Sequence, residues 1–323
     1  MGTSDSHVAR PSSRPRVSPR TGSGRSHTLR HGPYLAAGLS LLAVPVYLGV
    51  GAYVAHRMTA PPPSAATSSP ALYSLAFDSP QIRTRDGILL AAWFIPQAGS
   101  DRAVLMVHGL WTGRGCEFGG RFVELASRLH DRGYNVLMID LRKHGESGGD
   151  HFTFGAKERW DVLAAVGWLK QRGLKVGVLG VSLGAVSAAG AAADPEGGAT
   201  IRALVLDSAF ADSGETITRS FAQETGLPTL LLPGTFFMGR VLLGADLSTI
   251  RPPQELRKIR TPLLLIYGAK DRYISREQME EMRAARPDAQ FWLVDDVGHA
   301  ASYMAHDEEY TARVGRFLDA ALQ

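Results

Sequence analysis

The sequence lacks most of the residues on which disulfide-rich, metal-binding and nucleotide-binding proteins depend. One cysteine, Cys116, is present among 323 residues, so an intramolecular disulfide and a cysteine-rich metal site are both excluded. His108, His144 and His151 are scattered, without the spacing or the carboxylate partners of metal ligands. Neither a Gly-x-Gly-x-x-Gly turn after a first strand nor a phosphate-binding P-loop is present. We therefore expect no metal and no cofactor.

Excess charge is also scarce outside the N-terminus. The chain has a net charge of +4, but residues 1–31 hold six arginines and one aspartate, which leaves the remainder at −1. The body therefore offers no electrostatic basis for binding nucleic acid. Residues 1–31 contain almost nothing apolar to bury and are predicted to be disordered. A basic arm for nucleic acid is one interpretation of this tail, but the segment that follows favours another.

Residues 33–55 contain no charged side chain. As a helix this run would reach about 35 Å, enough for a hydrocarbon core of about 30 Å. Tyr34 and Tyr53 lie near its two ends, where aromatic rings prefer the membrane interface. A cleaved signal peptide is the main alternative, but its apolar core is usually shorter and no clean small-x-small cleavage site follows. We expect a retained transmembrane helix.

The charges that flank this run predict its orientation. The arginine-rich tail precedes it and only Arg57 follows closely, so the N-terminus should be cytoplasmic and the body extracytoplasmic. Residues 56–71 are rich in proline and serine and are predicted to form an extended linker. Residues 72–323 should then form the folded domain.

Strand and helix patterns alternate along this domain. Apolar runs predict strands at 77–84, 88–95, 103–107, 136–139, 176–180, 203–206, 263–267 and 291–294. Helical patterns between them indicate an α/β fold with a mostly parallel central sheet and helices on both faces. The strands at 203–206 and 263–267 are too far apart for one crossover. We expect a small helical lid at about 211–257, whose apolar residues either line an acyl pocket or pack the lid onto the domain.

The motif Gly-x-Ser-x-Gly spans residues 180–184, between the strand at 176–180 and an alanine-rich helix. A serine on such a sharp turn needs tiny neighbours two residues before and after it, and Gly180 and Gly184 meet that need. The turn would project the Ser182 hydroxyl from the end of the sheet, at the positive end of a helix. This geometry predicts a nucleophile.

Serine chemistry also needs a base and an acid, which should follow other parallel strands. His299 follows the last strand, and Asp271 follows the strand before it. Asp207, which ends a strand earlier, is the alternative acid. An oxyanion would need backbone donors, and one should be the N–H of Leu183, directly after the nucleophile.

These motifs together resemble the α/β-hydrolase family, from about Tyr73 to the end of the chain. The resemblance implies an α/β-hydrolase fold, and the chain order of Ser182, Asp271 and His299 is the order that this family uses. His108-Gly109 resembles the family's His-Gly turn, which implies that the Leu110 N–H is the second oxyanion donor, with Trp111 as the alternative. The run Asp-x-Arg-x-His-Gly-x-Ser, from Asp140 to Ser147, resembles a family loop with a structural role.

The expected function is that of a membrane-anchored serine hydrolase, which cleaves carboxylic esters of a small-molecule or lipid-like acyl substrate through an acyl-enzyme. Within the family, the chain most resembles single-span bacterial proteins grouped with serine aminopeptidase-like and lysophospholipase-like hydrolases. Serine aminopeptidase and thioesterase activities use the same machinery and stay open. A binding protein that has lost catalysis is disfavoured, because all three candidate positions are filled.

Overall fold

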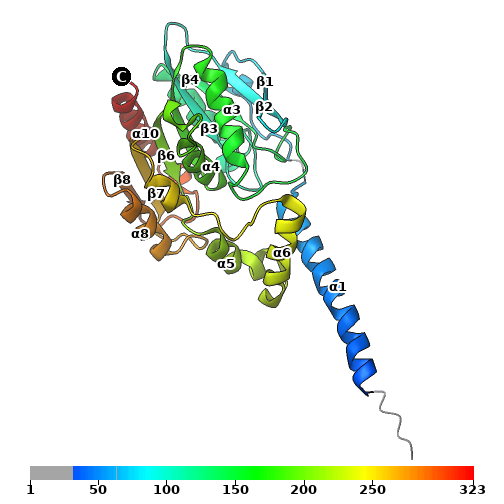
Figure 1. Ribbon diagram of the computed structural model, residues 1–323. Helices are drawn as coiled ribbons and strands as arrows, with labels where there is room; N and C mark the ends of the chain where they lie inside the picture. The colour runs from blue at the N-terminus through cyan, green and yellow to red at the C-terminus, as the bar shows by residue number, and fades with distance from the viewer. Residues whose placement is uncertain (1–31, 63) are drawn as a thin grey trace, which may run out of the picture. The chain divides into compact units, whose positions relative to one another are not determined.

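The structure is a computed structural model that describes residues 32–62 and 64–323 (Figure 1). Residues 1–31, which the sequence predicts to be disordered, lie outside the described residues. The chain divides into two compact units, Met1–Ala43 and Val44–Gln323, and the second contains the sheet and all the predicted site residues. Helix α1 (Gly32–Thr59) begins in the first unit and ends in the second.

The second unit is built on a sheet with the strand order β1-β2-β4-β3-β5-β6-β7-β8. Strands β1 and β2 pair antiparallel, as β2 does with β4, and the remaining pairs are parallel. The strands are β1 (Gln81–Arg83), β2 (Leu89–Ile95), β3 (Arg102–Val107), β4 (Asn135–Ile139), β5 (Lys175–Val181), β6 (Ile201–Asp207), β7 (Leu263–Gly268) and β8 (Gln290–Val294). The mostly parallel sheet expected from the sequence is confirmed.

Helices cover both faces of this sheet, because alternate side chains of each buried strand point to opposite sides. On β3, Leu105 joins the core beneath helices α3 (Glu158–Lys170), α4 (Leu183–Ala192) and α8 (Arg276–Ala285). Met106, the next residue, joins the core beneath α2 (Phe122–Asp131) and α10 (Asp307–Ala321). Both faces are therefore apolar, which explains the nearly continuous hydrophobic runs of the central strands.

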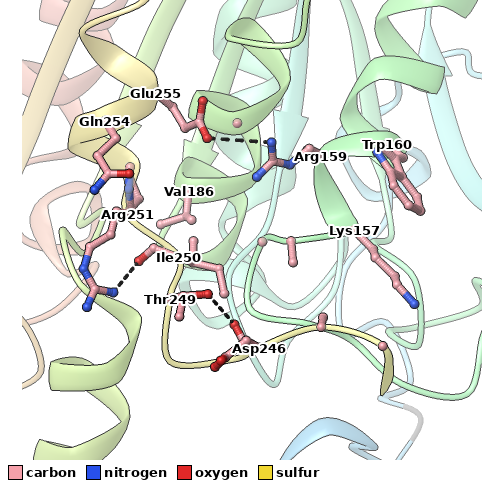
Figure 2. Close-up of a pocket in the computed structure, with 16 residues that line it drawn as sticks. Lys157, Arg159, Trp160, Val186, Asp246, Thr249, Ile250, Arg251, Gln254 and Glu255 are labelled. Carbon is pink, nitrogen blue, oxygen red and sulfur yellow. Dashed lines mark hydrogen bonds and ion pairs between the residues drawn. The ribbon is translucent and has the colours of Figure 1, made fainter. Parts of the chain in front are cut away.

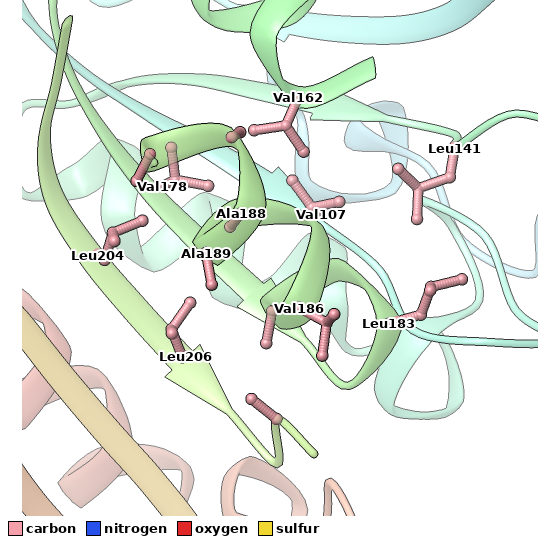
Figure 3. Packing of buried hydrophobic residues seen from close by; sticks show 14 of the residues in the cluster. Val107, Leu141, Val162, Val178, Leu183, Val186, Ala188, Ala189, Leu204 and Leu206 are labelled. Atoms are coloured by element: carbon pink, nitrogen blue, oxygen red, sulfur yellow. The ribbon is translucent and has the colours of Figure 1, made fainter. Parts of the chain in front are cut away.

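Helix α4 packs closely on the sheet because its side chains are small. All ten of its residues are buried, and most are alanine or glycine. Val186 and Ala189 of α4 lie over Val178 of β5 and Leu206 of β6 (Figure 3). This close packing fixes the start of α4, and with it the turn that carries Ser182, relative to the ends of β5 and β6.

The lid predicted between β6 and β7 is helical. It contains α5 (Ser213–Thr225), a short 3-10 turn η4 (Thr229–Leu231), α6 (Leu232–Leu243) and α7 (Pro252–Leu256). Asp212 caps α5 by accepting a hydrogen bond from the Glu215 N–H at 2.9 Å. The remaining short elements are the 3-10 turns η1 (Pro70–Tyr73), η2 (Glu117–Gly120) and η3 (Gly198–Thr200), and helix α9 (Ser302–Ala305).

The segment expected to cross a membrane lies in α1. Among the helices that the structure describes, none is both long and apolar enough to span a bilayer. The end of α1 belongs to the second unit, where Val54, Ala55 and Thr59 are buried. The Thr59 carbonyl accepts a hydrogen bond from the Phe152 N–H at 2.9 Å. The last turns of α1 thus pack on the domain.

The proline- and serine-rich segment after α1 contacts the domain instead of standing free. The Ser68 N–H and the Thr67 hydroxyl both donate to the Gly115 carbonyl, each at 3.0 Å. A side chain at position 115 would overlap this segment, so Gly115 permits the close approach. The predicted linker is therefore partly fixed along the domain surface by backbone contacts that its composition does not reveal.

Candidate active site

Ser182 lies on a strained turn between β5 and α4. Its φ of 50° and ψ of −109° are unusual for a residue with a side chain and cost about 1–3 kcal/mol. A Cβ on Gly180 would collide with the backbone of Gly184, and a Cβ on Gly184 would collide with the Val107 carbonyl. Both positions therefore need glycine if α4 is to start beside β3. This is the need for tiny neighbours that the motif predicts.

Ser182, His299 and Asp271 form one continuous line of polar contacts. The Ser182 Oγ lies 2.9 Å from His299 Nε2, and His299 Nδ1 lies 2.7 Å from Asp271 Oδ2. The other carboxylate oxygen of Asp271 accepts hydrogen bonds from the N–H groups of Tyr273, at 2.8 Å, and Ile274, at 3.0 Å. The Asp271 side chain is fully buried, whereas His299 is 20% exposed. The histidine therefore lies between a buried carboxylate and the serine hydroxyl.

The loops that carry the acid and the histidine are joined at their bases. A Cβ on Gly268, at the end of β7, would collide with the carbonyls of Val297 and Gly298. The Lys270 N–H donates to the Val297 carbonyl at 2.9 Å, which ties the two loops together. Gly268 therefore permits the close approach that brings Asp271 within hydrogen-bond distance of His299.

Asp207, the alternative acid, has other partners. Its carboxylate accepts hydrogen bonds from the Ser208 hydroxyl at 2.9 Å and from the Tyr310 hydroxyl of α10 at 3.0 Å. Ser208 Oγ in turn accepts the N–H of Ala300, which directly follows His299. Burial raises the pKa of Asp207 to about 6. Asp207 thus supports the backbone beside His299, while Asp271 contacts the imidazole itself.

The loop after β3 lies against the serine turn. A Cβ built on Gly109 would lie 3.3 Å from the Cβ of Ser182, so the backbone just before Leu110 is in contact with the predicted nucleophile. Leu183 is the first residue of α4, where a backbone N–H has no partner within the helix. Trp111 adopts a left-handed conformation, with φ of 62°, and its side chain is 52% exposed. Both predicted oxyanion donors therefore belong to segments next to Ser182.

Glu117 is a site residue that the sequence analysis did not identify. Its Oε2 accepts the Gly109 N–H at 2.6 Å, and its Oε1 accepts the Phe118 N–H at 3.3 Å. The carboxyl group is buried, and burial raises its pKa above the ordinary value. A carboxylate that directly holds Gly109 fixes the backbone on which Leu110 depends. No periodicity or motif marks Glu117, because its role depends on the irregular loop between Gly109 and η2.

His108 is fully buried and has a structural role. Its Nε2 accepts the Leu141 N–H at 3.0 Å and its Nδ1 lies 2.7 Å from the Gly109 carbonyl, which assigns the proton to Nδ1. Burial lowers its pKa to about 4. Both ring nitrogens of His108 are thus used to hold the loop after β3. Within residues 32–62 and 64–323, no three histidine, cysteine or acidic side chains gather closely enough to hold a metal ion.

The loop from Asp140 to Ser147 is also structural. Asp140 is buried and accepts hydrogen bonds from the guanidinium and the N–H of Arg114. Arg142 forms an ion pair with Asp161 of α3, with a nitrogen–oxygen distance of 2.6 Å. The Ser147 hydroxyl donates to the Asp140 carbonyl at 2.7 Å. The polar residues of this motif therefore hold the loop to its neighbours.

A cavity of about 320 Å³ lies between α3, α4 and the last part of the lid (Figure 2). Val186, one turn after Ser182, forms part of its wall. Its polar lining includes Lys157, Arg159 of α3 and Glu255 of α7, with Arg159 and Glu255 paired at 3.8 Å. This mixed charged lining does not suit an acyl chain. The apolar lid residues Ile217, Phe221 and Leu232 instead pack onto the domain. For these residues the structure agrees with the expectation that the lid's apolar side chains attach it to the domain.

A model of the Alpha/beta hydrolase family matches residues 104–314, well over half of the sequence. This chain belongs to the α/β-hydrolase family. The resemblance drawn from the motifs at Gly180–Gly184 and His108-Gly109 is thereby confirmed.

Relatives of this hydrolase support the same conclusion. The uncharacterized protein YqkD of Bacillus subtilis is 33% identical over 198 residues, 58% of this chain and 63% of that protein, so the match spans just under two thirds of YqkD. An uncharacterized Mycobacterium tuberculosis protein is 28% identical over 265 residues, 80% of this chain and 83% of that protein. Among solved structures, a Pyrococcus furiosus esterase is 29% identical, with a TM-score of 0.68, over 81% of this chain and 99% of that chain.

Proposed function

We propose that this α/β-hydrolase is a serine esterase in which Ser182 is the nucleophile, His299 the base and Asp271 the acid. The observation that carries the proposal is the line of contacts at 2.9 Å and 2.7 Å that joins these three side chains. An ester substrate is favoured over a peptide or a thioester because the Pyrococcus furiosus neighbour, 29% identical, is an esterase. A binding protein without catalysis would have no need for the strained Ser182 backbone.

In the proposed reaction the Ser182 Oγ attacks the acyl carbon of the ester while His299 Nε2 takes the hydroxyl proton. Asp271 holds the Nδ1 proton of His299 and stabilises the imidazolium that forms. The tetrahedral intermediate then collapses, and the departing alcohol takes the proton from Nε2. Water attacks the resulting acyl-Ser182 with His299 again as base, which releases the carboxylic acid and restores the serine.

The negative oxygen of the intermediate would be stabilised by the N–H groups of Leu183 and Leu110. The contact of Gly109 with Ser182 supports this assignment for the loop that carries Leu110. The loss of one such donor typically raises the barrier by about 3 kcal/mol. Glu117 would act as a positioning residue, because it holds the Gly109 N–H and touches no reacting atom.

The assignment of Ser182 is tested with a fluorophosphonate probe and p-nitrophenyl esters of rising chain length. Ser187 provides a matched control, because it lies five residues further along the same turn and helix, and its hydroxyl donates to the Leu183 carbonyl at 2.7 Å. We expect Ser182→Ala to lose the label and about 10⁴–10⁶ of turnover, and Ser187→Ala to keep both. Turnover of Ser182→Ala within tenfold of the wild-type value would exclude Ser182 as the nucleophile.

We also propose that residues 33–55 anchor the enzyme in a membrane, with the N-terminus cytoplasmic and the catalytic domain extracytoplasmic. The uncharged run and the arginines before it support this proposal. The test is the accessibility of an added N-terminal or C-terminal tag to protease in intact spheroplasts. Cleavage of the C-terminal tag alone is expected, and cleavage of neither tag, or of the N-terminal tag alone, would contradict the orientation.

A further inference from the structure

Large apolar side chains are exposed on two segments that are far apart in the sequence. On α1 they are Val44, Val46, Val50 and Tyr53, and in the lid they are Leu230, Phe237, Val241 and Leu242. Soluble proteins rarely expose contiguous apolar patches of this kind unless the patch binds something. We call these eight residues the apolar surface.

The two segments are in direct contact within the second unit. The Tyr47 hydroxyl donates to the Leu230 carbonyl at 2.9 Å and accepts the Gly234 N–H at 3.0 Å. The backbones of Gly51 and Gly234 lie so close that a Cβ on Gly51 would be 2.7 Å from Gly234 carbonyl carbon. The end of α1 and helix α6 are thus packed side by side (Figure 1). The apolar surface is therefore one feature shared by two helices.

On each helix the apolar residues divide between an inner and an outer face. Gly51, Val54 and Ala55 of α1 are buried, whereas Val50 and Tyr53 point outward. Helix α6 repeats this arrangement, with Gly234, Thr235 and Gly239 buried and with Phe237 and Val241 56% and 60% exposed. The inner faces satisfy the packing of the domain. The outer faces are apolar without a packing role, which is what helices whose outer face enters a bilayer require.

The charges within the two segments that carry the apolar surface are basic. Between Gly226 and Ala245 the one charged residue is Arg240, whose side chain is 73% exposed. Between Val44 and Phe77 the one residue charged at neutral pH is Arg57, which is also exposed. Asp246, just past the second segment, forms an ion pair with Arg240 at 4.0 Å. Two arginines in otherwise uncharged apolar segments complement the anionic headgroups and acyl chains of a bilayer.

The apolar surface also connects to the candidate active site. The lid residue Glu224 accepts a hydrogen bond from the Tyr273 hydroxyl at 2.9 Å, and the Tyr273 ring packs edge-on to His299 at 5.1 Å between centroids. Helix α5, which carries Glu224, leads directly into η4 and α6. We infer that α6 enters an anionic bilayer beside the end of α1, in the leaflet that faces the catalytic domain, so that the esterase acts on esters presented by that bilayer. The substrate part of this inference rests on the proposed function.

The experiment places an environment-sensitive nitrobenzoxadiazole label on the full-length protein, with Cys116→Ser as the background. The label is attached at Phe237→Cys, and Leu72→Cys, exposed on η1 outside the apolar surface, is the control. Vesicles of phosphatidylglycerol and phosphatidylcholine should increase the fluorescence at position 237 several-fold, and spin-labelled lipid should then quench it. Position 72 should respond to neither. Unchanged fluorescence at position 237 while the protein co-floats with the vesicles would overturn the inference. A label at position 237 that is already shielded by a second copy of the chain, before vesicles are added, would also overturn it.

A second variant tests the consequence for activity. Phe237→Asp with Val241→Asp should keep hydrolysis of a soluble short-chain ester within twofold and lose at least tenfold on a long-chain ester embedded in the same vesicles. Equal activity of wild type and variant on the embedded ester would overturn the link to substrate. If the wild type hydrolyses neither ester, the proposed function fails, while the fluorescence result still decides where α6 lies.

Discussion

Replacing Asp271 with asparagine should reverse the proton arrangement of His299. One carboxylate oxygen of Asp271 accepts two backbone N–H groups, at 2.8 Å and 3.0 Å, and the other faces His299 Nδ1 at 2.7 Å. An asparagine must place its carbonyl oxygen toward the two backbone donors, so its NH₂ group faces Nδ1. The imidazole then accepts at Nδ1 and carries its proton on Nε2, toward the Ser182 hydroxyl. Such a histidine cannot take the serine proton.

The expected loss in kcat is about 10⁴, the size seen for the corresponding change in a serine protease, or about 5 kcal/mol in the barrier. Asp207→Asn provides the comparison. Its carboxylate contacts the hydroxyls of Ser208 and Tyr310 and not the imidazole, so kcat should fall less than tenfold. One unpaired buried group costs about 1–3 kcal/mol, so the thermal midpoint at pH 4.5, where folded Asp207 holds its proton, should fall by several degrees.

The assay is kcat on a soluble p-nitrophenyl ester together with the thermal midpoint, measured for both variants under the same conditions. Asp271→Asn should lose rate with little loss of stability, and Asp207→Asn should do the reverse. The reasoning is refuted if Asp207→Asn is inactive but stable while Asp271→Asn stays active, because the acid would then lie one strand earlier.

Three further outcomes are expected. Glu117→Gln leaves one acceptor for the two N–H groups that Glu117 now holds, so kcat should fall about tenfold with KM within twofold, and an unchanged kcat would remove its positioning role. Removal of residues 1–43 should leave the thermal midpoint in detergent unchanged. Removal of residues 1–59 should lower the midpoint by about 5–10 °C, because buried α1 side chains are lost. Equal midpoints for the two deletions would show that the end of α1 does not stabilise the domain. The pKa of Asp207 is raised from 3.8 to about 6, so the wild type should lose up to about 3 kcal/mol of stability, relative to Asp207→Asn, as the pH rises from 3.8 through 6. Chemical unfolding at pH 4.5 and pH 7 covers about 2 kcal/mol of this loss, and a parallel pH dependence in both proteins would contradict it.

The sequence was sufficient to predict the features that depend on neighbouring residues. The strain at Ser182 requires glycine at positions 180 and 184, so the requirement is visible as a motif. Parallel strands place their C-terminal ends at one edge of the sheet, so residues that follow different strands are expected to meet. That rule brought Asp271 and His299 together, although 28 residues separate them.

Features that depend on irregular backbone or distant contacts could not be predicted in this way. Glu117 reaches Gly109 because Phe118 and Gly119 adopt left-handed conformations, with φ of 53° and 65°, and no propensity of phenylalanine indicates this. Tyr47 contacts Gly234 across 187 residues. The same apolar residues would also form a helix that makes no contact with the domain. Sequence analysis therefore could not predict that the end of α1 packs on the lid.

The contacts of α1 and those of the site share one physical cause, which is the absence of side chains where backbones must meet. Gly51 lets α1 approach α6, Gly268 lets the acid loop approach the histidine loop, and Gly184 lets α4 start against β3. In each case a single added methyl group would collide with a carbonyl group and push the two segments apart. Because the line from Asp271 to Ser182 consists of contacts at 2.7 Å and 2.9 Å, a displacement of 1 Å at Gly268 would break it without touching any of the three side chains. Gly268→Ala should therefore lower kcat in the way that Asp271→Asn does, and by more than a substitution on the protein surface.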